Sequence, residues 1–588
     1  MSNRQGTLKT LSKSVRGNRA VSVATVFCSM AEVVFEIVIP ICMSNLLDKG
    51  IQSGDMSAVW MYGAELLGLA ALAMTTGILA ARIGARASVG LAANLREGMY
   101  RNVQTFSFSN IDKFSTSSIV TRLTTDVTNV QNAYQMMLRI AVRGPAMLVF
   151  AMIVSFRISP DISRIFLIAI PVLGIPLALI SKGVHPIFAK VFRTYDKLNN
   201  IVQENVRGIR VVKSFDQEQH EIDKFHSVSE DIRSNFTKAE KILAFNSPLM
   251  QLCMYTCMIL ISWFGAKAIV ASGNDAAIGL TTGNLTALST YATQILMSLM
   301  MLSMVFSMII ISQASARRIA EILNEKTDIS NPSSPVMEVK DGSIDFDHVD
   351  FVYASKADKK VLSNIDVHIK SGETIGIIGG TGSSKTSLVQ LIPRLYDVTG
   401  GSLSLGGVNV KDYDLEVLRS SVAMVLQKNE LFSGTIKENL RWGNEDATDE
   451  QLEQACRLAC AHEFISAIPN GYDTYIEQGG VNVSGGQKQR LCIARALLSQ
   501  PKVLILDDST SAVDTHTDAL IQKALSQYMP QTTKLVIAQR ISSVQNADRI
   551  IVMDDGCINA IGKHDELLKS CEIYREVYES QQKGDSKE

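Results

Sequence analysis

A glycine-rich segment at residues 379–386 has the composition and spacing of a loop that binds phosphate groups. It follows the strand-like stretch ETIGIIG, precedes the helical stretch SLVQLIPRL and reads Gly379, Gly380, Thr381, Gly382, Ser383, Ser384, Lys385, Thr386. A strand, a glycine-rich turn and a helix N-terminus direct backbone N–H groups and the helix dipole toward a bound anion. We expect Lys385 to meet the β- and γ-phosphates of ATP, Thr386 to bind Mg²⁺, and Ser387 to complete the segment.

One position of this phosphate loop, residues 379–386, departs from the usual pattern. Ser384 precedes the lysine where the pattern has glycine. If that position lies at the start of the helix with an ordinary negative φ, a Cβ atom is tolerated there. We therefore expect nucleotide binding to survive the substitution.

Three further segments carry residues that suit nucleotide chemistry. Tyr353 in DFVYAS can stack on an adenine ring, although a lone strand tyrosine more often packs in a core. Gln427 in MVLQKNELF follows a strand and can bind Mg²⁺ and water, although alone it is an ordinary loop glutamine. The segment NVSGGQKQR opens a helix with small residues that let its backbone approach a phosphate. These residues, here called the signature segment, are Ser484, Gly485, Gly486 and Gln487.

Two strand ends carry the polar groups suited to hydrolysis. The strand VLILDD ends in Asp507 and Asp508, and the later strand VIAQR places Gln539 at its end. Asp507, Asp508 and Gln539 are therefore candidate site residues, together with Gln427. Glutamine can hydrogen-bond a γ-phosphate, but it cannot carry a proton or a positive charge as histidine can.

The chain divides sharply into an apolar half and a soluble half. It has 588 residues, of which 46% are hydrophobic, and its mean hydropathy is positive. An α-helix needs about 20 residues to cross a bilayer core of about 30 Å. Six stretches satisfy this length, near residues 20–47, 59–81, 137–158, 162–184, 243–271 and 285–312. From about residue 324 the pattern changes to the short alternating strands and helices of an α/β domain.

The two long connections between spans predict which side of the membrane holds the soluble half. Spans two to three and four to five are separated by charged, helix-patterned segments, which cannot lie in hydrocarbon and should project from one face. Basic residues dominate the N-terminus, which by the positive-inside bias lies in the cytoplasm. With six spans, the soluble domain is cytoplasmic too. A net charge of −1 gives no argument for a nucleic-acid partner.

Taken together, these motifs resemble those of the ATP-binding cassette transporters, and specifically the exporter-type half-transporters that fuse six spans to one cassette. The resemblance covers essentially the full length, and it implies a domain-swapped, all-α transmembrane domain followed by an α/β P-loop NTPase cassette. We expect a cytoplasmic N-terminal segment at 1–19, a transmembrane domain at 20–315, a linker at 316–342, a nucleotide-binding domain at 343–580 and a polar tail at 581–588. The implied location is the bacterial plasma membrane, in contact with lipid.

The resemblance also gives the two unusual strand ends a meaning. In this family each ATP is held between the phosphate loop of one subunit and the signature segment of the other. The resemblance implies that Asp507 is the Mg²⁺ ligand and that Asp508, Gln539 and Gln427 are the candidate catalytic residues. Asp508 stands where a catalytic Glu is expected, and Gln539 where a His is expected. Shortening the carboxylate by one methylene withdraws it by about 1 Å, and such displacements can lower a rate about 10²-fold. The chain thus resembles the degenerate-site subunit of bacterial heterodimeric multidrug exporters, whose partner carries the normal Glu and His.

Other readings of the same residues remain open. The chain could form a homodimeric exporter, an importer on the exporter fold, or a regulatory subunit that binds ATP and seldom hydrolyses it. The transported molecule could be a drug, a lipid or a peptide.

Several features outside the cassette bear on transport. Residues 106–127 and 201–215 resemble the first and second coupling regions, and the second is expected to reach the partner subunit. Glu32 and Glu36 lie one turn apart in the first span. They either form the wall of a cavity that attracts cations, or they form a structural pair with Arg139 or Arg143. A stripe of methionines in the sixth span suits either helix packing or an adaptable surface for apolar substrates. Its members are Met297, Met301, Met304 and Met308.

Overall fold

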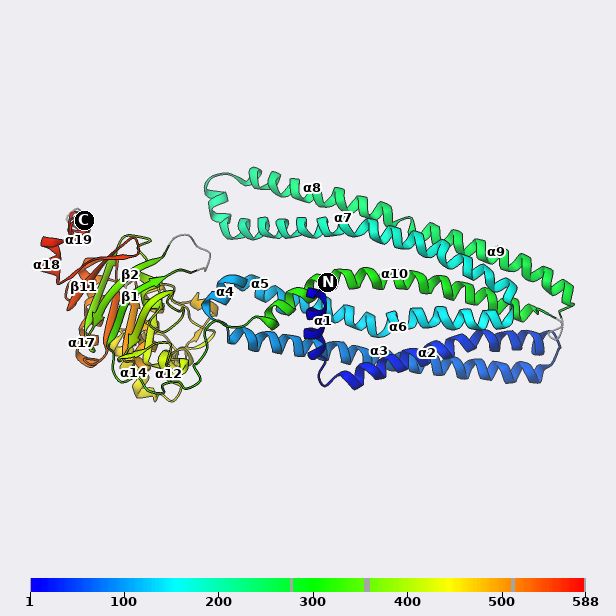
Figure 1. Cartoon of the computed structure of the whole chain (residues 1–588), viewed down its shortest axis with the longest axis horizontal. Coiled ribbons are helices and arrows are strands. Elements are labelled where there is room, and N and C mark those ends of the chain that lie inside the picture. Colours follow the sequence, from blue (N-terminus) through cyan, green and yellow to red (C-terminus); the bar gives the residue numbers. More distant parts are fainter. Residues whose placement is uncertain (1, 275–278, 354–359, 509–512, 586–588) are drawn as a thin grey trace. The chain divides into compact units, whose positions relative to one another are not determined.

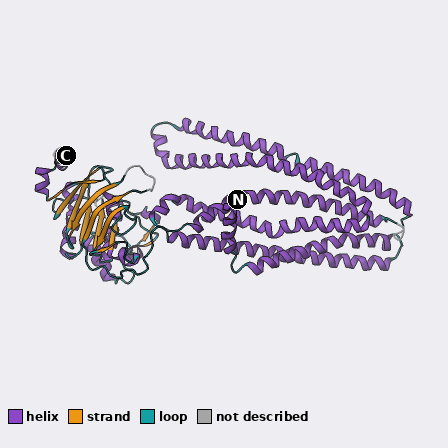
Figure 2. Cartoon of the chain, in the orientation of Figure 1, coloured by secondary structure: helices purple, strands orange, loops and turns teal. Residues whose placement is uncertain are grey.

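Two compact units make up the computed structural model, which describes residues 2–274, 279–353, 360–508 and 513–585. The first unit comprises Met1–Thr105 and Ser115–Glu325, and the second comprises Phe106–Phe114 and Lys326–Glu588. Figure 2 shows that the first is helical and that the strands belong to the second. The division therefore leaves residues 106–114, which sequence reasoning placed in the transmembrane domain, with the cassette.

Long helices build the first unit (Figure 1). Its elements are α1 (Ser2–Lys13), α2 (Arg19–Asn45), the π-helix η1 (Leu46–Ile51), α3 (Met56–Gln104), α5 (Thr116–Thr121), the π-helix η2 (Arg122–Asp126), α6 (Val127–Ile158), α7 (Pro160–Ser214), α8 (Glu218–Leu243), α9 (Asn246–Ser272) and α10 (Thr282–Asn324). Six helices among the described residues are long and apolar enough to cross a membrane. The prediction of six spans is thus confirmed.

The helices are longer than a bilayer requires. Helix α3 has 49 residues and α7 has 55. At 1.5 Å per residue these measure about 75 and about 80 Å, which is more than twice the hydrocarbon thickness of about 30 Å. The polar connections predicted from the sequence are therefore continuations of the membrane helices, and α8 returns antiparallel to the end of α7 (Figure 1).

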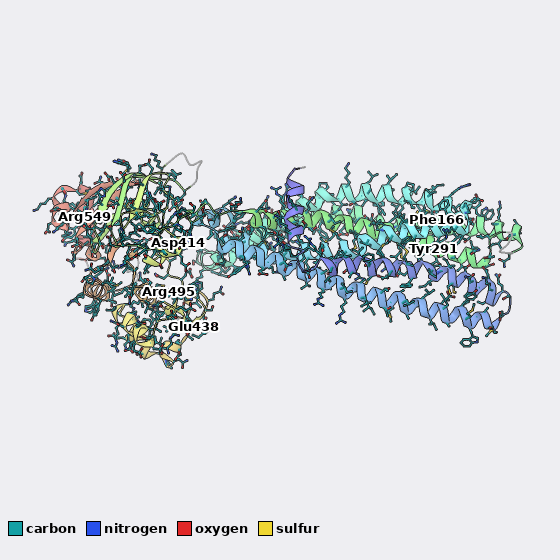
Figure 3. The ribbon with its side chains drawn as sticks, turned by 60° about the horizontal axis from the view of Figure 1, so that its bottom comes forward. Phe166, Tyr291, Asp414, Glu438, Arg495 and Arg549 are labelled. Carbon is teal, nitrogen blue, oxygen red and sulfur yellow. The ribbon has the colours of Figure 1, made fainter. Side chains whose placement is uncertain are left out.

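Large side chains from helices that are far apart in the sequence pack in the core of the helical bundle. Phe166 of α7 and Tyr291 of α10 are both buried, and Figure 3 shows them within the bundle. The Tyr291 hydroxyl donates a hydrogen bond of 2.6 Å to the carbonyl oxygen of Ile37 in α2. A buried hydroxyl needs such a partner, and here the partner ties the sixth span to the first.

Two sheets form the body of the second unit. The larger has the strand order β12-β11-β3-β10-β9-β6, in which only β12 is antiparallel to its neighbour. The smaller, β2-β1-β4-β5, is antiparallel, and β7 pairs with β8. The strands are β1 (Ile344–Phe351), β2 (Leu362–Ile369), β3 (Thr374–Gly379), β4 (Gly400–Leu405), β5 (Val408–Asn409), β6 (Val422–Val425), β7 (Gly434–Thr435), β8 (Tyr475–Ile476), β9 (Val503–Asp507), β10 (Thr533–Ile537), β11 (Arg549–Asp554) and β12 (Cys557–Gly562).

Helices cover the larger sheet, whose central strands are mostly apolar and are buried on both faces. Every residue of β9 and of β10 is buried, as expected for the inner strands of a parallel sheet. The helices of the second unit are α4 (Phe108–Phe114), α11 (Lys385–Gln390), α12 (Leu415–Ser421), α13 (Ile436–Arg441), α14 (Asp449–Leu458), α15 (His462–Ala467), α16 (Gly485–Leu498), α17 (Thr515–Tyr528), α18 (His564–Ser570) and α19 (Glu572–Asp585), with short 3₁₀ turns between some of them. The predicted α/β cassette is confirmed.

Hydrogen bonds and a capping box hold helix α16, which begins with the signature segment, against helix α13. Arg495 of α16 donates to the carbonyl oxygen of Asn439 at 2.9 Å and to its side-chain oxygen at 3.0 Å. Thr435 and Glu438 form a capping box at the start of α13, where Figure 3 labels Glu438 near Arg495. These contacts fix α16 against α13.

Helix α4 is built into the cassette unit by polar and aromatic contacts. The hydroxyl of Tyr396 donates to Asp112 of α4 at 2.9 Å, and the rings of Tyr396 and Phe108 are 5.9 Å apart. Ser109 donates to Asp328 at 2.6 Å. Helix α4, the short helix in the segment that resembles the first coupling region, thus packs on the cassette.

Candidate functional site

The candidate residues of the cassette meet at one edge of the larger sheet. The phosphate loop follows β3, Gln539 follows β10, and Asp508 follows β9. Strands β3, β10 and β9 are parallel neighbours, with Ile537 level with both Ile377 and Asp507. The carboxyl ends of neighbouring parallel strands lie at the same edge, which is where open α/β sheets bind ligands. Sequence-distant polar groups are therefore adjacent in space.

Lys385 folds back over the phosphate loop. Its ammonium group donates to the carbonyl oxygens of Gly379 at 2.8 Å and Gly380 at 2.9 Å, and to the hydroxyl of Ser383 at 3.2 Å. Burial lowers the pKa of Lys385, although the carboxylates of Asp507 and Asp508 act in the opposite direction. A phosphate bound in the loop would exchange these neutral acceptors for anionic ones, which make stronger hydrogen bonds.

The backbone of Ser384 differs from the sequence-based expectation. Its φ is 69° and its ψ is 22°, so this residue is left-handed rather than helical. The assumption of an ordinary negative φ was therefore wrong, because the loop must reverse direction immediately before the helix begins. A non-glycine residue costs about 1–2 kcal/mol in this region of φ and ψ, which is the physical reason why glycine is usual here.

We expect Ser384→Gly to stabilise the cassette. Relief of the left-handed strain, less the extra freedom that glycine has in the unfolded chain, should raise the free energy of unfolding by about 1 kcal/mol. The change is measurable as a higher midpoint of the cassette's thermal transition in the full-length protein. Thr381→Gly is the matched control, because Thr381 is exposed in the same loop and is not among the residues with positive φ. It should lower the midpoint, and an equal rise in both variants would refute the argument from strain.

Thr386 and Asp507 face each other as a pair of oxygen ligands. The threonine hydroxyl donates to Asp507 at 3.1 Å, and burial raises the pKa of that carboxyl group. Hydroxyl and carboxylate oxygens are donors that Mg²⁺ prefers, and Mg²⁺ is usually held by few protein groups together with substrate phosphates. Among the described residues no group of three or more His, Cys, Asp and Glu could hold a metal by itself. The donor set therefore fits an ion that arrives with a nucleotide.

Both candidate catalytic amides converge on a single carboxylate oxygen. Gln539 donates through Nε2 to Oδ2 of Asp508 at 2.7 Å, and Gln427 donates to the same oxygen at 3.3 Å. Asp508 is buried, with a φ of 47°. Burial raises the pKa of its carboxyl group against the opposing effect of these two hydrogen bonds. The oxygen that would accept a proton from an attacking water is thus already shared by two amides.

Tyr353 lies beside the phosphate loop, where it belongs to an aromatic cluster. Its hydroxyl lies 2.7 Å from that of Ser387, and the residue is 41% exposed. The ring is 5.0 Å from that of Tyr396 and 4.8 Å from that of Phe351, both edge to face. Because Tyr396 also bonds Asp112, the aromatic cluster joins the candidate adenine-binding residue to helix α4.

The signature segment is a well-capped helix start. The hydroxyl of Ser484 accepts from the backbone N–H of Gln487 at 3.3 Å, and the Gln487 side chain accepts from the N–H of Ser484 at 2.9 Å. This capping box orders the backbone of Gly485 and Gly486, the first residues of α16. One turn later, buried Gln489 donates to the carbonyl oxygen of Asp508 at 3.4 Å.

Residues 509–512, which follow Asp508, lie outside the described residues. Asp514 caps the start of α17 by accepting a hydrogen bond from the N–H of Thr517 at 2.9 Å.

Sequence reasoning missed three residues of this site, namely Tyr396, Gln489 and Gln581. Gln489 lies in the quoted signature stretch and could have been found from its spacing to Ser484. No sequence signal connects Tyr396 to Asp112, which is 284 positions away. Gln581 fell in the expected polar tail, whereas in the structure α19 continues to Asp585.

In the helical unit the charged residues of the first span are paired. Arg143 of α6 donates to Glu32 at 2.9 Å and to both carboxylate oxygens of Glu36, at 2.7 and 2.9 Å. Of the two readings left open, these contacts match the structural pair with Arg143. One arginine between two carboxylates avoids an unpaired charge within the bilayer.

Three methionines of the predicted stripe, Met297, Met301 and Met304, line a cavity of about 490 Å³ between α7, α9 and α10, whereas Met308 is not among its lining residues. Met297, Met301 and Met304 are exposed in this chain rather than packed inside its bundle. Asn246 at the start of α9 also lines the cavity, and its side-chain oxygen is buried with no hydrogen-bond partner among the described residues. Further lining residues are Leu177, Ile180, Met250, Met300 and Ser303.

Comparison with known families also divides the chain into a membrane region and a cassette. Residues 22–300 match the family described as the ABC transporter transmembrane region, and residues 362–511 match the family described as ABC transporter. The solved structure of a bacterial Atm1-family ABC exporter with ATP bound superimposes with a TM-score of 0.82 at 22% identity. It covers 96% of this chain and 99% of that one.

Curated relatives match over most of their length. The ABC transporter ATP-binding protein YfiB of Bacillus subtilis is 36% identical over 552 residues, which is 94% of this chain and 95% of that protein. The ATP-dependent lipid A-core flippase of Desulfotalea psychrophila is 34% identical, over 79% of this chain and 80% of the flippase. The probable multidrug resistance ABC transporter protein YheI of B. subtilis is 33% identical, over 74% and 73% respectively.

Proposed function

The chain belongs to the ATP-binding cassette transporter family as an exporter-type half-transporter, and from this premise we propose that it is the hydrolysis-impaired subunit of a heterodimer. Half-transporters of this family bind ATP and couple its hydrolysis to transport across a membrane. The observation that carries the proposal is the pairing of Asp508 with Gln539 and Gln427 on one oxygen. A short carboxylate held by two neutral amides is poorly placed to activate water.

In the proposed site the cassette binds MgATP without turning it over rapidly. Lys385 neutralises the β- and γ-phosphates, and the backbone N–H groups of the phosphate loop surround them. Thr386 and Asp507 would hold the Mg²⁺, with Gln427 nearby, and the ion would neutralise charge on the phosphates. Tyr353 would lie against the adenine ring. The intact binding residues and the altered hydrolytic pair support this separation of binding from turnover.

The signature segment serves the other active site in this proposal. Ser484, Gly485 and Gly486 would close over an ATP held by a partner half-transporter that carries the usual Glu and His. The capping box between Ser484 and Gln487 supports this role, because it holds the backbone donors of the segment in an ordered conformation. ATP bound between two cassettes would draw them together.

Movement of the cassettes would reach the membrane helices through two cytoplasmic connections. One contains helix α4, and the other joins α7 to α8. Helix α4 binds its own cassette through Asp112 and Tyr396. The end of α7 and the turn that follows it expose apolar side chains, including Val211 and Phe215, which suits contact with the partner's cassette. We place the cassette and the basic N-terminus in the cytoplasm and the spans in a bacterial plasma membrane.

The proposed cargo is amphipathic, such as a drug, a lipid or a peptide. The cavity lined by methionines supports this class, because thioether side chains adapt to apolar molecules of different shape. Two of the relatives described above are a lipid A-core flippase and a probable multidrug resistance transporter. Both names fit export of amphipathic molecules.

The proposal predicts that the full-length chain purified alone retains ATP but hydrolyses it slowly. Adding a half-transporter with the usual Glu and His should raise turnover per complex by about 10²-fold, since one well-placed carboxylate is then present. The measurement is phosphate release by the reconstituted protein, alone and with candidate partners. Brisk turnover by the chain alone would show instead a homodimer in which Asp508 and Gln539 are active.

A further inference from the structure

The C-terminal helix α19 reaches the loop that carries Gln539. Tyr574 of this helix is fully buried, and Val577 and Tyr578 pack on the same apolar core. The hydroxyl of Tyr574 lies 2.7 Å from His564 Nδ1. Residues 574, 577, 578 and 581 share one face of an α-helix, because successive turns bring positions i, i+3, i+4 and i+7 together. Gln581 therefore lies on the docked face of α19.

Gln581 makes two hydrogen bonds to the loop, one in each direction. Its amide nitrogen donates to the carbonyl oxygen of Gln539 at 2.7 Å, and its amide oxygen accepts from the N–H of Ile541 at 2.9 Å. The side-chain amide pairs with the backbone as a neighbouring strand would, with one hydrogen bond on each side of Arg540. Both partners are backbone groups, so the contact does not depend on the side chain at position 539.

The rest of this loop, residues 538–541, is held at its two ends. The N–H of Ala538 donates to Ile377 of β3 at 3.3 Å, and Ile541 is buried at the start of a 3₁₀ turn. Between these points the side chain of Gln539 reaches Asp508 at 2.7 Å. The Gln581 contact thus holds the two peptide groups that directly follow Gln539, the residue that faces the hydrolytic carboxylate.

We propose that Gln581 is a positioning residue for ATP hydrolysis, and that the C-terminal helix sets the position of the loop that carries residue 539. This inference rests on the proposed role of residue 539 opposite Asp508. Loss of the two hydrogen bonds would let the loop sample more conformations, so that residue 539 would meet its target less often. Binding of ATP would be spared, because Lys385, Thr386 and Tyr353 belong to other elements.

The test compares Gln581→Met with Gln582→Met in the full-length chain. Methionine preserves the length and apolar stem of glutamine but makes neither hydrogen bond, so α19 should remain docked. Gln582 is the neighbouring exposed glutamine, whose amide donates to Tyr578 rather than to the loop. Hydrogen exchange of peptides that cover residues 538–544 should become about tenfold faster in Gln581→Met, because opening is eased by about 1.4 kcal/mol. It should stay unchanged in Gln582→Met.

A kinetic arm uses the background Asp508→Glu, Gln539→His, in which turnover becomes measurable. There Gln581→Met should lower kcat about tenfold and leave the KM for ATP unchanged. Unchanged exchange in the loop would overturn the proposal. So would a fall in kcat accompanied by a raised KM and a lower unfolding midpoint, because that pattern identifies a merely structural contact. If the background itself gains no turnover, the proposed function fails, while the exchange result still decides whether Gln581 holds the loop.

Discussion

Replacing Ser484 by arginine is expected to abolish most ATP turnover of the assembled transporter, whereas Asp508→Ala should change it by less than about twofold. The arginine removes the hydroxyl that caps α16, and it places a long side chain where the partner's γ-phosphate must approach. Loss of a positioned donor and displacement of the phosphate together lower rates by about 10²-fold or more. Asp508, in contrast, lies in the site that contributes little to turnover.

The measurement is steady-state phosphate release by the complex with its partner, with ATP retention measured in parallel. Val483→Leu is the matched control for Ser484→Arg, because it changes the adjacent residue without altering the cap. Both variants should retain ATP in the phosphate loop, which holds Lys385 and Thr386 unchanged. Equal losses from Ser484→Arg and Asp508→Ala would contradict the asymmetric assignment.

The overall architecture could be predicted because it depends on local periodicity. Long apolar runs give the six spans, and strands such as VLILD, which is apolar up to its final aspartate, give a buried parallel sheet. Asp508, Gln539 and Gln427 could be assigned to one site before their distances were known because their motifs resemble those of a known family. The structure adds the physical reason, which is that the ends of neighbouring parallel strands meet at one edge of the sheet.

Backbone conformation and long-range pairing could not be predicted in the same way. Whether Ser384 adopts a negative or a positive φ depends on how the loop turns into α11, which residue type alone does not determine. The contacts between Tyr396 and Asp112 and between Gln581 and Gln539 join elements that meet only through tertiary packing. A polar residue near a chain end has the composition of a tail even where it forms part of a site.

Restoring the usual pair, with Asp508→Glu and Gln539→His, is expected to raise ATP turnover of the full-length chain about 10²-fold. The added methylene advances the carboxylate by about 1 Å toward the attacking water. The imidazole can carry a proton or positive charge opposite the γ-phosphate, which an amide cannot. In a dimer of two such chains, each restored site would be completed by the capped signature segment of the other copy.

Single variants separate the two contributions to this gain. Asp508→Glu alone should recover less, because Gln539 remains in reach of the lengthened carboxylate and both amides can still donate to it. Gln539→His alone should recover little, since the short carboxylate stays withdrawn. Phosphate release gives the rate, and equilibrium binding of ATP should be the same in all four proteins because Lys385 and Thr386 are unchanged. No gain in the double variant would mean that the limiting defect lies outside Asp508 and Gln539. The proposal that this chain binds ATP while its partner's site hydrolyses it would then lack its physical basis.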